Sequence, residues 1–164
     1  MKKILPLLFM LCSIPAISQE VAPLVDFNGY FRSFQNGFFR QIEFQRIGEF
    51  KFGDNVVGYI DNRSNLRVFD GTKPRDLANL EAEYQVSDNL LVWKIGTTLN
   101  LWDAGNLKTL SYFADQYIIK DSLVVYIDTR YNSLNTYYNG EVYTLSSSVG
   151  DVIMPDYIGE NIIA

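Results

Sequence analysis

Histidine is absent from the sequence, and cysteine occurs only once, at Cys12. Without histidine the chain cannot build a Ser-His-Asp triad or a Cys-His pair, and it lacks the most common general base. Zinc sites made of imidazole or several thiolates are excluded for the same reason. One cysteine also has no partner for a disulfide within the chain. We expect no cofactor and no metal, because the sequence has neither metal-ligand spacing nor a glycine-rich phosphate loop.

Positive charge is also scarce, since 14 Lys and Arg residues stand against 19 Asp and Glu residues. A protein that binds nucleic acid neutralises phosphates with a basic face, which this composition does not supply. Beyond the N-terminus, no apolar stretch reaches the roughly 20 residues that a transmembrane helix needs. Nucleic acid is therefore not expected as a partner, and the mature chain is expected to have no transmembrane span.

The N-terminal segment 1–18 is typical of a secretory signal peptide. Two lysines form a basic n-region, an apolar stretch runs from Ile4 to about Ile14, and small residues stand at Ala16 and Ser18. Cleavage after Ser18 leaves residues 19–164, which have no cysteine and a net charge of −7. A short basic n-region and a cysteine-free mature chain suggest a bacterial envelope protein. We expect it in the periplasm, at the outer membrane or outside the cell.

A repeated pattern runs through the mature chain. Four turn glycines follow one another at spacings of 34, 34 and 35 residues: Gly37, Gly71, Gly105 and Gly140. A second set of landmarks, the acidic residues that open each apolar run, has spacings of 34, 33 and 39: Asp54, Asp88, Asp121 and Glu160. Together they predict repeats at approximately 20–53, 54–87, 88–120 and 121–159, with the start of another at 160.

Each period has the pattern of short β-strands. The apolar runs NVVGYID, NLLVWKI and SLVVYID have strand length and are rich in β-branched residues. A second strand follows each run and ends at a turn with Asn-Gly, Asp-Gly or Asp-Ala-Gly, which is a strong hairpin signal. The only helical candidate, residues 74–84, is expected to be loop and strand. The apolar run is expected to be the inner, most buried strand, because neighbouring sheets pack on both of its faces.

Three or four antiparallel strands per period of this length are typical of a β-propeller blade, and propellers usually have four to eight blades. The phrase type "DNLVVYID…L-x-VFYNG" resembles exported bacterial β-propeller repeat proteins, in particular those of the Bacteroidetes, over residues 20–164. The Gly-His…Trp-Asp pair of WD-repeats, the double glycine of Kelch and the sialidase box are absent, so the resemblance implies only the broad class.

We therefore expect an all-β fold, a β-propeller-like array of antiparallel blades with one blade for each period. The segment ENIIA, which begins at Glu160, matches DNVVG position for position and then stops. This match favours an incomplete, N-terminal portion of a propeller over a four-bladed ring that is closed by its last strand.

Two Asp-x-Arg pairs are candidates for ligand binding. Asp61 and Asp128 stand at equivalent points of two repeats, and Arg63 and Arg130 follow them two residues later. On one rim of a propeller such pairs could bind a carboxylate or a sugar. The alternative is a local ion pair or a turn brace on an exposed loop.

Aromatic side chains are the second kind of candidate. Trp102 and Tyr138 lie beside the glycine turns and are expected to be partly exposed, where they could stack on a sugar; the alternative is packing between blades. The recurring Asp54, Asp88 and Asp121 could be calcium ligands, but their neighbours show no D-x-D-x-D spacing. We expect these aspartates to stabilise turns instead.

Three functions remain open. The first is a non-catalytic binding or scaffold module of the bacterial cell envelope, which presents blade loops to a protein or glycan partner. The second is a carboxylate-dependent glycan-acting enzyme of propeller architecture, which needs two carboxyls about 5–9 Å apart across the central cavity. The recurring acids lie at turns instead, which favours binding. The third, an outer-membrane β-barrel, would need alternating strands of about ten residues, and the expected strands are shorter.

The pattern Ala16-x-Ser18 predicts that the exported protein begins with Gln19. Intact-mass measurement of the protein recovered from the envelope or the medium should give the mass of residues 19–164. Exported protein that still contains Met1 would contradict the predicted cleavage.

Overall fold

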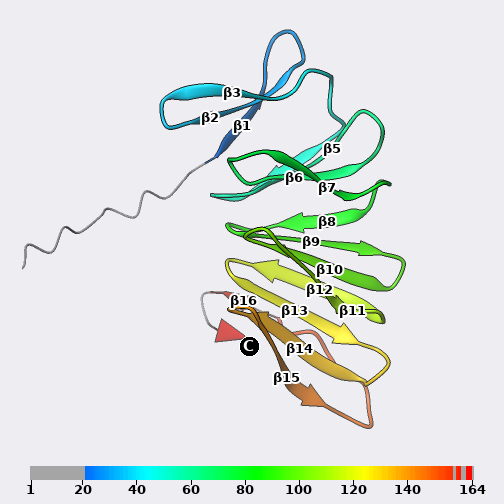
Figure 1. Cartoon of the computed structure of the whole chain (residues 1–164). Helices are drawn as coiled ribbons and strands as arrows, with labels where there is room; N and C mark the ends of the chain where they lie inside the picture. Colours follow the sequence, from blue (N-terminus) through cyan, green and yellow to red (C-terminus); the bar gives the residue numbers. More distant parts are fainter. Residues whose placement is uncertain (1–20, 157, 160–161, 164) are drawn as a thin grey trace, which may run out of the picture.

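The computed structural model describes residues 21–156, 158–159 and 162–163, and its regular structure consists of β-strands (Figure 1). The predicted signal peptide and Glu160 lie outside the described residues. The described part of the chain has no helix that is long and apolar enough to cross a membrane.

The strands form successive antiparallel sheets, which we call blades 1 to 5. Blade 1 has three strands: β1 (Ala22–Val25), β2 (Phe31–Gln35) and β3 (Phe38–Glu43). Blade 2 has four: β4 (Phe50–Phe52), β5 (Val57–Ile60), β6 (Leu66–Phe69) and β7 (Pro74–Ala78). Blade 3 has four: β8 (Glu83–Val86), β9 (Leu90–Ile95), β10 (Thr98–Asp103) and β11 (Asn106–Ser111). Blade 4 has four: β12 (Ala114–Lys120), β13 (Leu123–Asp128), β14 (Ser133–Tyr138) and β15 (Glu141–Ser147). Blade 5 has two: β16 (Ile158–Gly159) and β17 (Ile162–Ile163).

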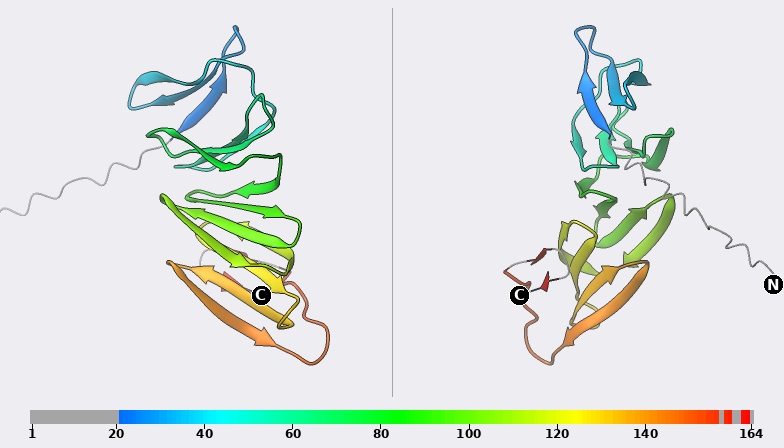
Figure 2. Two further views of the ribbon diagram at one scale, coloured as in Figure 1. Left: turned by 45° about the vertical axis from the view of Figure 1, so that its right-hand side comes forward. Right: turned by 90° about the vertical axis from the view of Figure 1, so that its left-hand side faces the viewer.

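Within each blade the strands lie side by side in chain order, and the blades are stacked one after another (Figures 1 and 2). The predicted all-β array of antiparallel blades is confirmed, and it forms a partial, unclosed propeller. Residues 74–84 contain strand β7 and the start of strand β8, so the helical alternative for this segment is wrong. Leu77 lies in β7 and Leu80 is exposed in the bend after it, so these two apolar residues do not share one helical face.

The three copies of the apolar run form equivalent strands, β5, β9 and β13. The repeat predicts that Val57, Leu91, Val124 and Ile162 occupy equivalent sites. The first three each pair with an aromatic residue of the following strand: Val57 with Phe69, Leu91 with Trp102, and Val124 with Tyr137. The predicted equivalence of these positions is therefore confirmed. The fourth predicted position, Ile162, is wrong by one residue, because Ile163 pairs with Ile158 as Leu91 pairs with Val86, whereas Ile162 pairs with Gly159.

These strands are the most buried of their blades, but they are not the innermost ones. Each is the second strand of its sheet and follows β4, β8 or β12. The first strands meet the neighbouring blade: β8 contacts both β4 and β5, and β16 contacts both β12 and β13. A strand with apolar side chains on both faces is best buried when hydrogen-bonded neighbours also cover both of its edges.

Alternate side chains of each buried strand point toward the two blades on either side of it. In β9, Leu91 and Trp93 belong to the apolar cluster shared with blade 2, whereas Leu90 and Val92 belong to the cluster shared with blade 4. Strands β5 and β13 divide their side chains in the same way, so one cluster fills each joint between blades. Each blade thus has two apolar faces, which only stacking can bury.

The antiparallel order gives the blades two different ends. The glycine rim holds the turns between first and second strands and those between third and fourth strands. Gly71, Gly105 and Gly140 all lie there, as predicted, at hairpins between third and fourth strands, with φ of 82°, 96° and 85°. The loop rim, at the opposite end, holds the turns between second and third strands and the connections between blades. Blade 1 has counterparts of the second to fourth strands, because the Gly37 hairpin joins β2 to β3.

Hydrogen bonds between successive blades join the Asp-Asn turns of the glycine rim. The donor and acceptor pairs are Val21 N–H to Asp54 C=O at 2.8 Å, Asn55 N–H to Asp88 C=O at 2.9 Å, and Ser87 Oγ–H to Asp121 C=O at 2.6 Å. The recurring aspartates therefore contribute main-chain carbonyls to hydrogen bonds between blades, and stabilisation of the turns by their side chains stays a prediction.

Gly53 lies at the closest approach of two such turns. A Cβ at this position would stand 2.0 Å from the carbonyl oxygen of Ser87, so Gly53→Ala must separate blades 2 and 3. We expect this substitution to lower the free energy of unfolding by at least about 2 kcal/mol, measured by urea denaturation. Gly150→Ala is the control, because its Cβ would have space. Equal effects of the two substitutions would contradict this packing.

Candidate functional site

Asp61 stands at the loop rim directly after β5 and braces the loop that follows. Its Oδ1 accepts the N–H of Arg63 at 2.8 Å and the N–H of Asn65 at 2.9 Å, and its Oδ2 accepts the side-chain amide of Asn65 at 3.0 Å. Burial by itself raises the pKa of Asp61, but the hydrogen bonds from Asn65 and Arg63 outweigh it and lower the pKa below its ordinary value. The carboxylate therefore stays charged and holds the loop.

Asp128 has the same position at the end of β13. Its Oδ1 accepts the N–H groups of Arg130 at 3.0 Å and Tyr131 at 3.2 Å, and its Oδ2 accepts the hydroxyl of Ser111 at 2.6 Å. In both blades the aspartate thus binds the backbone of the arginine two residues later. This is the arrangement of a turn brace, and ligand binding by the two carboxylates stays a prediction.

Blade 1 has a third aspartate of this kind, which sequence reasoning missed. Asp26 Oδ1 accepts the N–H groups of Asn28 and Tyr30, both at 2.9 Å, and its Oδ2 lies 2.9 Å from Nε of Arg32. The glycine spacing of 34 residues aligns Asp61 with the neighbouring residue, Phe27, instead. A shift of one residue in the first repeat was enough to hide the equivalence.

Blade 3 lacks such an aspartate for a structural reason. Its second and third strands are longer, ending at Ile95 and beginning at Thr98, so only two residues connect them. Gly96 supplies the positive φ of 60° that so tight a hairpin requires. A brace is needed only where the loop is longer.

Trp102 and Tyr138 lie toward the glycine rim, at the other end of the blades. The expectation that Trp102 is partly exposed is wrong: it is 2% exposed, within the core between blades 2 and 3. The guanidinium group of Arg75 covers its ring at 4.9 Å, so no face is left for a ligand. Tyr138 is half-buried and points away from blade 3, because the preceding Tyr137 donates to Asp103 of that blade.

The six predicted site residues are therefore not brought together. Two lie in blade 2, one in blade 3 and three in blade 4, and they are divided between the two rims. Arg130 is exposed, and its Cζ lies 5.4 Å from the ring centroids of both Phe113 and Tyr131. Of the six, only Asp61 and Arg63 line a cleft among those described below.

The contact between Arg75 and Trp102 recurs at each joint between complete or nearly complete blades. A cation on the fourth strand of one blade lies over an aromatic ring on the third strand of the next: Arg40 over Phe69 at 6.0 Å, Arg75 over Trp102 at 4.9 Å, and Lys108 over Tyr137 at 5.3 Å. The cation also donates to the turn carbonyl in two joints: Arg40 to Gly71 and Lys108 to Gly140, both at 2.8 Å. We call this contact the cation clamp. Each clamp contributes about 0.5–2 kcal/mol.

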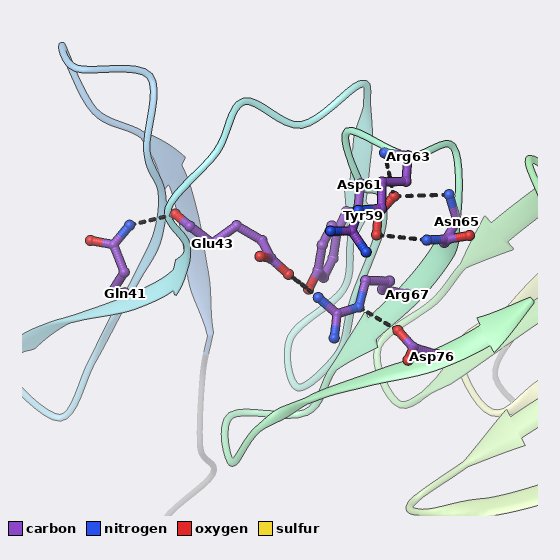
Figure 3. A network of polar contacts seen from close by, with 8 residues as sticks. All are labelled: Gln41, Glu43, Tyr59, Asp61, Arg63, Asn65, Arg67 and Asp76. Carbon is purple, nitrogen blue, oxygen red and sulfur yellow. Dashed lines mark hydrogen bonds and ion pairs between the residues drawn. The ribbon is translucent and has the colours of Figure 1, made fainter. Parts of the chain in front are cut away.

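A polar cleft lies at the loop rim between blades 1 and 2. Its volume is about 300 Å³, and its walls contain three carboxylates, two guanidinium groups and three amides: Glu43, Asp61, Asp76, Arg63, Arg67, Gln45, Asn62 and Asn65. A second hollow of about 490 Å³ shares Asp61 and Asn62 with it, so the loop after β5 stands between the two. Figure 3 shows the side chains that form the network of the cleft.

Arg67 is the centre of this network (Figure 3). Its Nη1 binds Oε1 of Glu43, which also accepts the hydroxyl of Tyr59 at 2.8 Å, and its Nε lies 2.6 Å from Oδ1 of Asp76. Glu43 belongs to blade 1 and the other three residues to blade 2, so the network joins two blades across the cleft. Burial and the hydrogen bond to Glu43 raise the pKa of Tyr59, so its hydroxyl remains a donor.

Sequence reasoning missed Glu43, Arg67 and Asp76. A signal existed for Arg67, because Arg32 precedes it by 35 residues at the equivalent position of β2. Glu43 gave no signal, because it ends β3, and the connection that follows differs in length from blade to blade. In the described part of the chain, no three Asp, Glu, His or Cys side chains are grouped so as to hold a metal ion.

A family model described as a 10-bladed beta propeller domain matches residues 15–164. The chain belongs to this family. The propeller of this family has more blades than the four to eight that are usual. The predicted bacterial origin stays a prediction.

Several solved structures also resemble the propeller. Human WBSCR16 has a TM-score of 0.46 and 5% identity, over 76% of this chain and 49% of that one. The N-terminal domain of Nup159 has a TM-score of 0.46 and 12% identity, over 89% and 50%. Kluyveromyces lactis Hsv2 has a TM-score of 0.41 and 13% identity, over 82% and 49%. The chain spans about half the length of these structures, and no curated protein sequence matches it.

The two carboxylates that flank Arg67 allow a matched test of the network. Glu43 is 21% exposed and also binds Tyr59, whereas Asp76 is 64% exposed. We expect Glu43→Ala to lower the free energy of unfolding by about 2 kcal/mol, because it leaves the buried Tyr59 hydroxyl and the half-buried Nη1 of Arg67 without this acceptor. Asp76→Ala should cost less than about 1 kcal/mol. Chemical denaturation measures both, and equal losses would contradict a role for Glu43 in joining the blades.

Proposed function

We propose that the protein is a non-catalytic binding module that presents the loop rim of its propeller to a partner protein in the cell envelope. The observation that carries this proposal is the polar cleft between blades 1 and 2, whose walls come from rim loops on rigid sheets. Binding residues are commonly placed on loops that a rigid scaffold positions. The glycine rim is less suited, because hydrogen bonds between blades already occupy its turns.

A protein partner fits the cleft better than a glycan does. Sugar recognition by stacking requires an accessible aromatic ring, but Trp102 is covered on both faces and the cleft walls contain no aromatic residue. Charged and amide groups dominate the cleft instead. Arg63 stands exposed at its edge, and arginine is enriched at protein interfaces because it offers several donors and a planar apolar face.

Binding is also favoured over carboxylate catalysis. A glycosidase-type pair needs one carboxyl group with a raised pKa that acts as the acid. In the cleft, Glu43 is bound by Tyr59 and Arg67, and Asp76 is bound by Arg67. The pKa of Asp61 is lowered, so this group is ionised at neutral pH and has no proton to donate.

The envelope location rests on the sequence of residues 1–18 alone. A basic n-region, a short apolar stretch and the Ala16-x-Ser18 pattern support export. A partner met after export would be a periplasmic, outer-membrane or extracellular protein.

Site-specific photo-crosslinking in cells that express the protein tests the proposed function. A photo-reactive amino acid at position 63 should give a defined adduct with one protein, identified by mass spectrometry. The same group at position 107, where Leu107 is exposed on β11 away from the cleft, should not give that adduct. Binding of the purified partner should weaken at least about tenfold in Arg63→Ala. Equal adducts from both positions, or specific binding to a glycan array without a protein adduct, would overturn the proposal.

A further inference from the structure

Lys94 breaks the repeat at a position that is aliphatic in the other blades. The residues at this position each pair with a buried apolar residue of the next strand: Val25 with Phe31, Ile60 with Leu66, Lys94 with Leu99, and Ile127 with Leu134. Ile60 and Ile127 are buried in the apolar clusters that join their blades to the next. In blade 3 the same position brings an ammonium group into the joint with blade 4.

A pocket of about 320 Å³ lies beside this lysine, between blades 3 and 4. Blade 3 contributes Glu83 and Lys94 from its first two strands, and blade 4 contributes residues 115–118 of β12. Met154, from the connection that follows blade 4, is also part of the wall. The volume is at the lower end of the range for small-molecule sites. The pocket shares no residue with the polar cleft between blades 1 and 2, so it is a separate candidate site.

The ammonium group of Lys94 has donors left for a ligand. Its Nζ donates to the carbonyl oxygen of Asp115 at 3.0 Å, lies 3.9 Å from Oε2 of Glu83, and lies 5.9 Å from the ring centroid of Tyr117. An ammonium group has three donors, and of these contacts only the first is within hydrogen-bond distance. Glu83 is 63% exposed, so its ion pair with Lys94 stabilises the joint only weakly.

Tyr117, which also lines the pocket, has a buried hydroxyl group without a hydrogen-bond partner in the described part of the chain. Its counterpart in blade 3 is Tyr84, whose hydroxyl donates to the carbonyl oxygen of Gly58 at 3.4 Å. Burial and the carboxylate of Glu83 raise the pKa of Tyr117, so its hydroxyl keeps its proton and remains a donor. Buried donors are normally paired, so this one beside a pocket points to an acceptor on a ligand.

The charges of the wall favour a ligand that carries both signs. Glu83 and Asp115 supply two carboxylates, and Lys94 supplies one ammonium group. A simple anion would meet the two carboxylates and a simple cation would meet the lysine, and like charges brought together weaken binding. A zwitterion can place each of its charges beside the opposite one. Ile118 and Met154 add an apolar part to the wall, which suits an apolar group on the ligand.

We propose that the pocket between blades 3 and 4 binds a free α-amino acid with an apolar side chain. Lys94 binds the carboxylate of the ligand, and the hydroxyl of Tyr117 is a second donor to it. Glu83 binds the ammonium group, and Ile118 and Met154 contact the side chain. An α-amino acid carries both charged groups on one carbon atom, so they reach the neighbouring Lys94 and Glu83 together.

Isothermal titration calorimetry of the purified protein with L-leucine and two derivatives tests the ligand class. We expect saturable binding of L-leucine at one site per chain. N-acetyl-L-leucine lacks the ammonium group and L-leucinamide lacks the carboxylate, so each should bind at least about tenfold more weakly. Absence of L-leucine binding at millimolar concentration, or a derivative that binds as tightly as L-leucine, would overturn the proposal.

Two substitutions of lysine by isoleucine test the location of the site. Lys94→Ile restores the residue of blades 2 and 4, so it should abolish L-leucine binding without lowering the melting temperature. Lys73→Ile is the matched control, because Lys73 is exposed in a turn of the glycine rim, outside the pocket. Glu83→Gln removes a charged acceptor and should weaken L-leucine binding at least about tenfold. A folded Lys94→Ile variant that binds like the wild type, or equal losses in both isoleucine variants, would contradict the assignment.

Discussion

Each blade can bury its apolar faces only against other blades, and the remaining features of the structure depend on this constraint. A sheet of three or four short strands is one layer thick, so it encloses no core of its own. The single strand β9 shows the consequence, because Leu91 and Trp93 face one neighbour while Leu90 and Val92 face the other. The cation clamps and the hydrogen bonds between turns of the glycine rim add stability to joints that apolar packing forms.

The same constraint separates the roles of the two rims. At the glycine rim, main-chain hydrogen bonds and arginine or lysine donors connect turns to the neighbouring blade. These turns therefore help to hold the blades together. At the loop rim, aspartates such as Asp61 brace their own loops from within. Loops that are stabilised by their own aspartates leave their outward-facing side chains free to contact a partner. The polar cleft and the exposed Arg63 lie at this rim.

The fold was predictable from the sequence because each repeat is marked by patterns of residues that are close together in the chain. Apolar runs of strand length and Asn-Gly or Asp-Gly turns recur at a fixed spacing, and the structure turns each into the expected strand or hairpin. Burial of Trp102 was not predictable, because it depends on Arg75, which an adjacent blade contributes. The network of Glu43, Arg67 and Asp76 was missed for a similar reason: it is assembled across a joint, from segments whose spacing does not repeat.

The contiguity of each blade has a consequence for how the chain acquires its structure. Every complete sheet is made from one unbroken segment of the chain, and all its strand pairs are neighbours in sequence. Contacts between residues close in sequence form quickly, because little loop entropy is lost when they close. A finished blade then offers its open face as a template on which the next can condense, as in other repeat proteins. Because each sheet is complete before the next is synthesised, blades can be added in chain order during synthesis.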